Sequence, residues 1–277
     1  MLFSFAFEVL FMDLQRLYSY TRRAIDDYHM IEEGDKIAVA VSGGKDSITL
    51  ALALKGLERF YPKHFTIHAY TVSIGFPDMD FAPLSSFFAV HGIPYDVIRT
   101  QIKEIVFDTR EEKNPCSLCA TLRKGALYDQ AKADGCNKVA LGHHMEDTVE
   151  TLLLSLIYEG RLNTFQPVTY LSRTGLTVIR PLIYLPEKEI VYFTNKQSLP
   201  VLHNTCPADG FTKRQDVEDL LTELNKKDHH TTLRMFTAIQ RSDLPGWENY
   251  TPGPRPRDRG GAHGHRGRSH PRDEECP

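Results

Sequence analysis

The stretch Lys36-Ile-Ala-Val-Ala-Val-Ser-Gly-Gly-Lys-Asp-Ser-Ile-Thr-Leu50 decides the fold, because an apolar segment runs directly into a Ser/Gly turn that opens a helix. The run 37–41 is typical of a buried parallel strand, whereas the apolar residues from Ile48 onward follow helical spacing. The turn is therefore a strand-to-helix connection. Its glycines let the backbone approach a ligand, and its serine hydroxyls and the N–H groups of the helix start can bind an anion.

Phosphate or pyrophosphate is the anion that suits such a turn. The pattern is neither the Walker motif nor the spaced glycines of dinucleotide folds. It resembles the PP-loop of the ATP pyrophosphatases, which cleave ATP between the α and β phosphates and adenylylate a carbonyl oxygen. The alternative is a Ser/Gly turn that serves only as a helix start. The resemblance implies that ATP is bound by Ser42, Gly43, Gly44, Lys45, Asp46 and Ser47.

Composition is that of a globular chain with a substantial core: 277 residues, 41% apolar and 25% charged. The net charge of −3 gives no global sign of nucleic-acid binding, so any basic surface must be local. Five cysteines argue against a disulfide framework. They leave thiols for metal binding or catalysis in a reducing compartment.

The apolar segment 1–11 raises the question of a signal peptide or a membrane span. It lacks a basic start, Glu8 interrupts it, and it is shorter than the ~20 residues that a membrane-spanning helix needs. We therefore expect a cytoplasmic protein with no membrane association.

Strands that alternate with helices predict an α/β fold with a doubly wound, mostly parallel, five-stranded sheet. Ligands of such a sheet lie beyond the carboxyl ends of the strands, where the turn 42–47 is expected. The expected strands are 37–41, 66–73, 95–98, 138–141 and 199–202. The expected domains are an N-terminal extension with an amphipathic helix (1–34, the helix from Asp13 to Met30), a PP-loop domain with the cysteines (35–225), a helical segment (226–244) and a disordered Pro/Gly/Arg/His-rich tail (245–277).

A second motif follows the expected strand 138–141. Gly142 and His143 lead into a helix whose first turn carries Glu146 and Asp147. Adjacent carboxylates at that place suit Mg²⁺, which takes one or two protein oxygens and shares the rest with water and phosphate. The simpler alternative is an acidic first turn that only complements the helix dipole. We expect Gly142, His143 and Asp147 to bind the nucleotide, and Asp46 and Asp147 to hold Mg²⁺.

The cysteines form a separate pattern. Cys116 and Cys119 lie on one side of a helix start, and a third thiol, Cys206, lies near the end of the folded region. Three thiolates with an open coordination position suit an iron–sulfur cluster, and three-ligand zinc and a redox disulfide remain alternatives. Cys136 is expected to be an ordinary half-buried residue, and Cys276 incidental.

These motifs, together with Leu141-Gly-His-His144 and Arg180-Pro-Leu, fall in the order of the tRNA 2-thiocytidine synthetase (TtcA-like) family, which the chain resembles over about 13–221. The resemblance implies a tRNA sulfurtransferase that adenylylates O2 of an anticodon-loop cytidine with Mg-ATP and replaces that oxygen by sulfur. It further implies a 4Fe-4S cluster on Cys116, Cys119 and Cys206, which with Asp46 are the catalytic residues. The implied partners are tRNA, a sulfur donor such as a cysteine desulfurase, and a second copy of the chain in a homodimer.

Two positions depart from the family pattern. Glu146 stands where members often carry Asp, and Asp209 where some carry Cys. Arg123 and Lys124 are candidates for tRNA phosphate contacts, or side chains that only solvate a helix. The rival functions are a ligase resembling tRNA-Ile lysidine synthetase, which has no need of Cys116 and Cys119, and a non-catalytic sensor that binds nucleotide and cluster.

Overall fold

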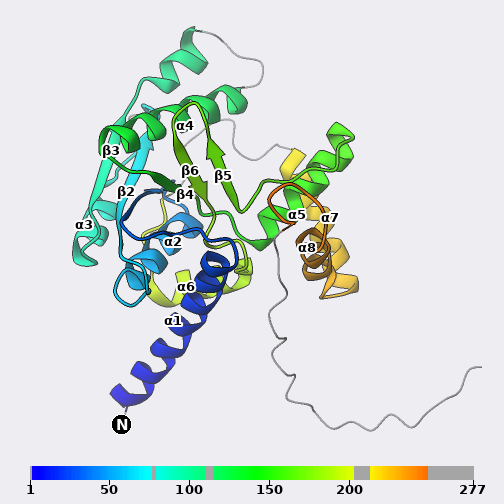
Figure 1. Ribbon diagram of the computed structural model, residues 1–277, viewed down its shortest axis with the longest axis horizontal. Coiled ribbons are helices and arrows are strands. Elements are labelled where there is room, and N and C mark those ends of the chain that lie inside the picture. Colours follow the sequence, from blue (N-terminus) through cyan, green and yellow to red (C-terminus); the bar gives the residue numbers. More distant parts are fainter. Residues whose placement is uncertain (1, 77–78, 110–114, 203–212, 249–277) are drawn as a thin grey trace, which may run out of the picture.

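The computed structural model describes residues 2–76, 79–109, 115–202 and 213–248, with side chains from residue 14 onward. Its centre is a six-stranded sheet of order β3-β2-β1-β4-β6-β5 (Figure 1). Neighbouring strands are parallel except for β5, which runs antiparallel to β6. The predicted α/β class with a mostly parallel sheet is confirmed. The strands are β1 (Asp35–Ala40), β2 (Phe65–Ser73), β3 (Tyr95–Arg99), β4 (Lys138–Ala140), β5 (Val168–Leu171) and β6 (Leu176–Ile179).

The predicted five-stranded count was wrong, because the β5–β6 hairpin was missed and the expected strand 199–202 is not a strand. Leu202 instead donates its N–H to the carbonyl of Gly43 (2.9 Å), so the segment lies along the PP-loop. Pro200 also lacks the N–H that a central strand needs. The hairpin was hard to detect because β5 is an edge strand whose Tyr170 is 67% exposed, which breaks the apolar pattern.

Helices cover both faces of the sheet. Helix α4 packs on one face, and α1, α2, α3 and α6 pack on the other (Figure 1). The helices are α1 (Leu2–Asp27), α2 (Lys45–Leu57), α3 (Ala82–Val90), α4 (Pro115–Ala133), α5 (Met145–Leu154), α6 (Glu187–Gln197), α7 (Lys213–Lys227) and α8 (Thr231–Gln240), with π-helical turns η1 (Glu104–Thr109) and η2 (Ser155–Glu159). None of the described helices is long and apolar enough to cross a membrane.

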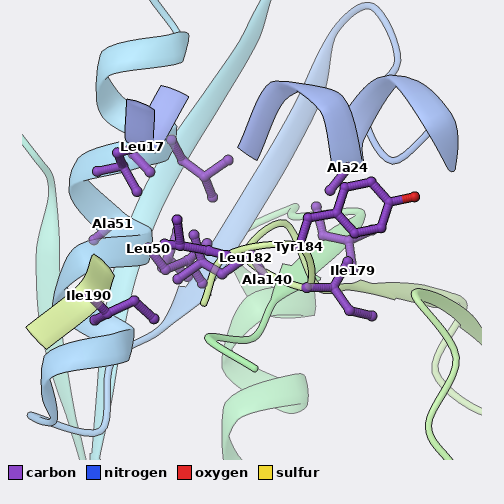
Figure 2. Close-up of a cluster of buried hydrophobic side chains, with 14 of the residues drawn as sticks. Leu17, Ala24, Leu50, Ala51, Ala140, Ile179, Leu182, Tyr184 and Ile190 are labelled. Carbon is purple, nitrogen blue, oxygen red and sulfur yellow. The ribbon is translucent and has the colours of Figure 1, made fainter. Parts of the chain in front are cut away.

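Strand β1 shows how the sequence divides the core. Ile37 and Val39 belong to the large cluster on the α2 face, whereas Ala38 belongs to the smaller cluster under α4, as the alternation of side chains along a strand requires. Figure 2 shows part of the large cluster, where Leu50 of α2 lies near Leu182. Full burial of a leucine side chain contributes about 1.5–3 kcal/mol. The buried packing on both faces of the sheet therefore stabilises the strands that position the loops at their ends.

The folded region reaches further along the chain than predicted. Trp247, which falls in the expected tail 245–277, is fully buried and packs edge-on against Tyr28 and Phe236. Its Nε1 donates to the carbonyl of Phe165 (3.2 Å). The apolar contact and the buried hydrogen bond tie this end of the chain to the core. The rest of the expected tail, from residue 249, lies outside the described residues.

The strand order places two loops side by side. From β1 the chain moves to β2 and β3 on one side, and β4 later pairs with the other side of β1. The direction of the strand order therefore changes between β1 and β4, which makes this pair the switch point of the sheet. The loops that follow β1 and β4 both lie at the carboxyl ends of these two strands.

Candidate active site

Serine hydroxyls hold the PP-loop between β1 and α2. Ser47 Oγ donates to the carbonyl of Gly44 (2.9 Å) and accepts from the N–H of Ser42 (3.1 Å), and it lies 3.2 Å from Ser42 Oγ. Gly43 has φ +90°, in the left-handed region that favours glycine. Gly44 precedes α2 and caps it with no side-chain hydrogen bond. A helix start without a capping side chain suits a phosphate ligand.

The loop after β4 touches the PP-loop directly. A Cβ built on Gly142 would lie 3.1 Å from the carbonyl carbon of Asp46 and 3.1 Å from the amide nitrogen of Ser47. Both atoms belong to the backbone, so they could not move aside without moving the PP-loop. Glycine is therefore the residue that allows this approach, and the two sequence motifs form one site.

A cavity of about 340 Å³ lies between these loops and α4. Polar and apolar residues both line it, as is usual in pockets that bind a small molecule. The polar lining residues are Ser42, Asp46, Ser47, Arg123, Lys124, His143 and Asp147. The other lining residues are Ala40, Val41, Tyr70, Val72, Ala120, Leu127, Leu141 and Gly142.

Asp46 carries a buried carboxylate oxygen whose hydrogen-bonding capacity is unused. Its Oδ1 accepts no hydrogen bond from any described residue, although Lys45 Nζ lies 3.2 Å away as an ion-pair partner. Burial raises the pKa of Asp46 above its ordinary value, and the charges of Lys45 and His144 only partly offset that effect. Lys45 Nζ also pairs with Glu187 of α6 (3.0 Å).

Asp147 is the more fully occupied of the two carboxylates. Its Oδ2 accepts from the N–H of His144 (2.9 Å), which caps α5, and its Oδ1 accepts from Arg214 Nη2 of α7 (2.9 Å). A cation on Asp147 would therefore share the carboxylate with Arg214. Among the described residues no group of three or more His, Cys, Asp or Glu side chains is arranged to hold a metal ion.

His144 is a residue of the site that the sequence analysis did not predict. It is buried between the carboxylates of the site, with Nδ1 3.2 Å from Glu146 and Nε2 3.4 Å from Asp147 and 3.9 Å from Asp46. Burial alone would lower the pKa of His144, but the hydrogen bond to Glu146 and the charges of Asp147 and Asp46 outweigh it and raise the pKa to about 9. The imidazolium therefore stabilises the acidic cluster at neutral pH.

His143, by contrast, is held neutral. Arg180 Nε donates to its Nδ1 (3.0 Å), and its ring stacks on Phe165 with centroids 4.7 Å apart. Burial and the charge of Arg180 lower the pKa of His143 to about 4. Burial likewise lowers the pKa of Arg180 to about 10. The two adjacent histidines therefore carry different charges at neutral pH.

Arg214 is a second contributor that no motif predicts. It lies in the first turn of α7, and its Nε is 3.0 Å from Glu150 of α5, whose side chain is 9% exposed. Burial raises the pKa of Glu150 although Arg214 opposes the shift. Arg214 thus ties α7 to Glu150 and Asp147, two acidic residues of α5. This long-range pairing has no signature in the sequence.

The cysteines of α4 lie one helical turn before the cavity wall. Cys116 precedes Ala120 by four residues and Cys119 precedes Arg123 by four, so both share a side of the helix with residues that line the cavity. Cys116 is exposed, and Cys119 is half-buried against the cluster of Ile74, Ile102 and Val106. Cys136 is buried under the other end of α4. Cys206, Asp209 and Cys276 lie outside the described residues.

Comparison with known proteins gives consistent matches. The family described as a PP-loop domain matches residues 16–206. The tRNA-cytidine(32) 2-sulfurtransferase of Geobacter metallireducens is 39% identical over 233 residues, covering 83% of this chain and 88% of that protein. The enzyme of the same name from Geotalea uraniireducens is 41% identical over 228 residues, covering 81% of this chain and 90% of that protein.

A solved structure shares the fold. It is the U34-tRNA thiolase NcsA from Methanococcus maripaludis with its 4Fe-4S cluster, with a TM-score of 0.67 and 21% sequence identity. The match covers 83% of this chain and 78% of that one. At this identity the likeness shows a common fold.

Proposed function

This chain belongs to the PP-loop family of tRNA-cytidine(32) 2-sulfurtransferases, and from that premise we propose that it uses ATP to replace O2 of cytidine 32 in tRNA by sulfur. The observation that carries the proposal is the cavity that Ser42, Ser47 and Asp147 line together with α4. Cys116 and Cys119 lie one helical turn before Ala120 and Arg123, which are lining residues of α4.

ATP takes the cavity with its phosphates at the start of α2. The serine hydroxyls, Lys45 and the amides of Gly43 and Gly44 bind the phosphates, and the helix dipole adds to the attraction. Gly142 allows the two loops to close on the nucleotide. The apolar end of the cavity, between Val72 and Leu127, accepts the adenine.

Asp46 would bind Mg²⁺ beside the phosphates, because its buried Oδ1 accepts no hydrogen bond from the described residues. Asp147 would be the second ligand, sharing its Oδ1 with Arg214. A bound Mg²⁺ supplies positive charge to offset the charge that develops on the departing pyrophosphate.

The chemistry has two substitutions. In the first, O2 of the cytidine attacks the α-phosphorus, a P–O bond forms, the bond to the β-phosphate oxygen breaks and pyrophosphate leaves. In the second, a sulfide attacks C2, and the C2–O bond breaks to release AMP. Ser42, Ser47 and the PP-loop amides are already oriented by their own hydrogen bonds, so they stabilise the developing charge without reorganising.

The sulfur-carrying group is assigned to the cysteines. An exposed thiol and a half-buried thiol three residues apart on one helix side fit two corners of an iron–sulfur cluster. Cys206 would be the third ligand. When bound, a 4Fe-4S cluster with three protein ligands supplies an iron that can carry the incoming sulfur.

The partners follow from the reaction. Arg123 and Lys124 line the cavity on the α4 side, and in this proposal they contact phosphates of the tRNA. A sulfur donor such as a cysteine desulfurase supplies the sulfide, and the cytoplasm, where tRNA is used, is the place of action. The proposed homodimer rests on the resemblance to the family alone. The cysteines on the cavity side of α4 favour thiolation over the ligase, which does not need them. Asp46 and Asp147, which line the cavity beside the PP-loop, favour catalysis over the sensor.

Expression in a bacterial strain that lacks its own tRNA-cytidine(32) 2-sulfurtransferase tests the proposal. Mass spectrometry of nucleosides from purified tRNA should detect 2-thiocytidine when the chain is expressed and none when it carries Ser47→Ala. Absence of 2-thiocytidine with abundant, folded wild-type protein would refute the proposal. Lysidine in place of a thionucleoside would favour the ligase.

A further inference from the structure

Arg180 is a buried cation that contacts His143, a residue of the cavity wall. It follows β6 directly and is 9% exposed. Its Nη1 donates to the carbonyl of Gln166 (2.5 Å) and to Thr169 Oγ1 (3.3 Å), and its guanidinium lies over the ring of Phe165, 4.8 Å from the centroid. These contacts fix the guanidinium plane. A second nitrogen of the guanidinium, Nε, donates to Nδ1 of His143 (3.0 Å).

The hydrogen bond from Arg180 determines where the proton of His143 lies. A guanidinium carries only donors and stays charged in proteins, so Nδ1 of His143 must be the acceptor and carries no hydrogen. In a neutral imidazole the proton then lies on Nε2, which leaves an Nε2–H donor for the cavity that His143 lines. Phe165, stacked on both side chains, keeps the ring in this orientation.

The surrounding charges favour the same neutral form. Arg180, Arg214 of α7 and Lys124 of α4 oppose a positive charge on His143, whereas Asp147 of α5 favours it. Protonation of Nδ1 would also break the hydrogen bond from Arg180 and place two cations in contact. An Nε2 that already carries its proton cannot accept another. His143 therefore cannot act as a general base through Nε2.

We propose that Arg180 is a positioning residue that locks His143 as a neutral Nε2–H donor to an oxygen of the nucleotide bound in the cavity. The nucleotide part of this inference rests on the proposed function, whereas the state of the His143 ring does not. In this role His143 binds an oxygen of the nucleotide without exchanging a proton at Nε2.

Nuclear magnetic resonance of protein labelled with nitrogen-15 histidine tests the ring state without any ligand. His143, assigned by its loss in His143→Gln, should show an unprotonated Nδ1 and a protonated Nε2 from about pH 5 to about pH 8. In Arg180→Ala the ring should become a mixture of tautomers. Thr169→Val, which removes one Arg180 contact and leaves Nε in place, should keep the wild-type pattern. A protonated Nδ1 in wild type, or titration near pH 6.5, the ordinary pKa of histidine, would overturn the inference even if Arg180→Ala fails to fold.

Calorimetry with a non-hydrolysable ATP analogue tests the donor role. His143→Gln, which keeps an N–H donor, should weaken binding by less than about threefold, and His143→Leu by about tenfold to a hundredfold. Equal losses in the two variants would overturn the donor role. No binding to wild type would refute both the proposed function and the nucleotide part of the inference, and the ring state would still be decided by the spectra.

Discussion

Gly142 lies against the backbone of Asp46, so that a Cβ at position 142 would stand 3.1 Å from the carbonyl carbon of Asp46. This contact joins the loop after β4 to the PP-loop, and it makes the carboxylates of both motifs neighbours of one cavity. The relationship can be tested by adding a single methyl group.

Gly142→Ala should displace the PP-loop by a few tenths of an ångström or more and reduce kcat/KM for ATP by about a hundredfold, because catalysis is sensitive to such misplacement. Steady-state release of pyrophosphate measures the effect. Gly125→Ala is the matched control, since a Cβ at Gly125 meets nothing within 4 Å and alanine favours a helix. Wild-type kinetics in Gly142→Ala would contradict the assigned contact.

Asp46→Asn should abolish magnesium-dependent turnover, with a loss of at least about a hundredfold in kcat, because the amide is a poor ligand for Mg²⁺. The free energy of unfolding should stay the same or rise, since burial disfavours the charged form of Asp46. Thermal unfolding and pyrophosphate release measure the two quantities. Full activity in the variant would exclude Asp46 as a metal ligand.

The paired histidines predict how stability depends on pH in the absence of magnesium. The pKa of His143 falls to about 4 on folding, so the unfolded chain binds more protons below about pH 6.5 and stability decreases as the pH falls toward about 4. The pKa of His144 rises to about 9, so its stabilisation is full below about pH 6.5 and is lost as the pH rises through about 9.

Urea unfolding across this range should therefore show a maximum between the two limits. His143→Gln should flatten the acid side of the profile, and His144→Gln should flatten the alkaline side. A variant that changes the opposite side of the profile would contradict the assigned charge states.

Arg214→Ala should lower the free energy of unfolding by about 2–4 kcal/mol, because it leaves the buried carboxylate of Glu150 unpaired. The double variant Arg214→Ala/Glu150→Gln should recover part of that loss. Arg234→Ala is the control, since Arg234 pairs with Asp228 at the surface and is 66% exposed, where ion pairs contribute about 0–1 kcal/mol. Equal losses in the two single variants would show that Glu150 does not need Arg214.

Local sequence was sufficient for the elements whose signal is local. The apolar run into Ser42 and Gly43 predicted β1, the PP-loop and α2. The alternation of strands and helices predicted that β1, β2, β3 and β4 are parallel, but not their order in the sheet. The β5–β6 hairpin was missed because an edge strand needs only one apolar face. Segment 199–202 was misread because its side chains do not share one environment: Leu199 joins the core cluster, Val201 is exposed and Leu202 lies against Gly43 of the PP-loop.

The sequence predicted only those residues of the site that belong to a local motif. Gly142, His143 and Asp147 were predicted to lie near the PP-loop because they follow a strand, and all three line the same cavity as Ser42 and Ser47. Arg180 follows its partner His143 by 37 positions in the chain, and Arg214 follows its partner Asp147 by 67 positions. Tertiary packing alone therefore decides these contacts. The different charge states of His143, which is neutral, and His144, which is positive, depend on those same contacts.

The most direct measurement is anaerobic reaction of the purified, cluster-loaded protein with ATP, magnesium, sulfide and unmodified tRNA, followed by quantitation of AMP and 2-thiocytidine. The wild-type protein should form the two products in equal amounts, Ser47→Ala neither, and Cys116→Ala no 2-thiocytidine. Wild-type yields of 2-thiocytidine from Cys116→Ala, or none from the loaded wild type, would contradict the claim that the PP-loop and the thiols of α4 serve one reaction.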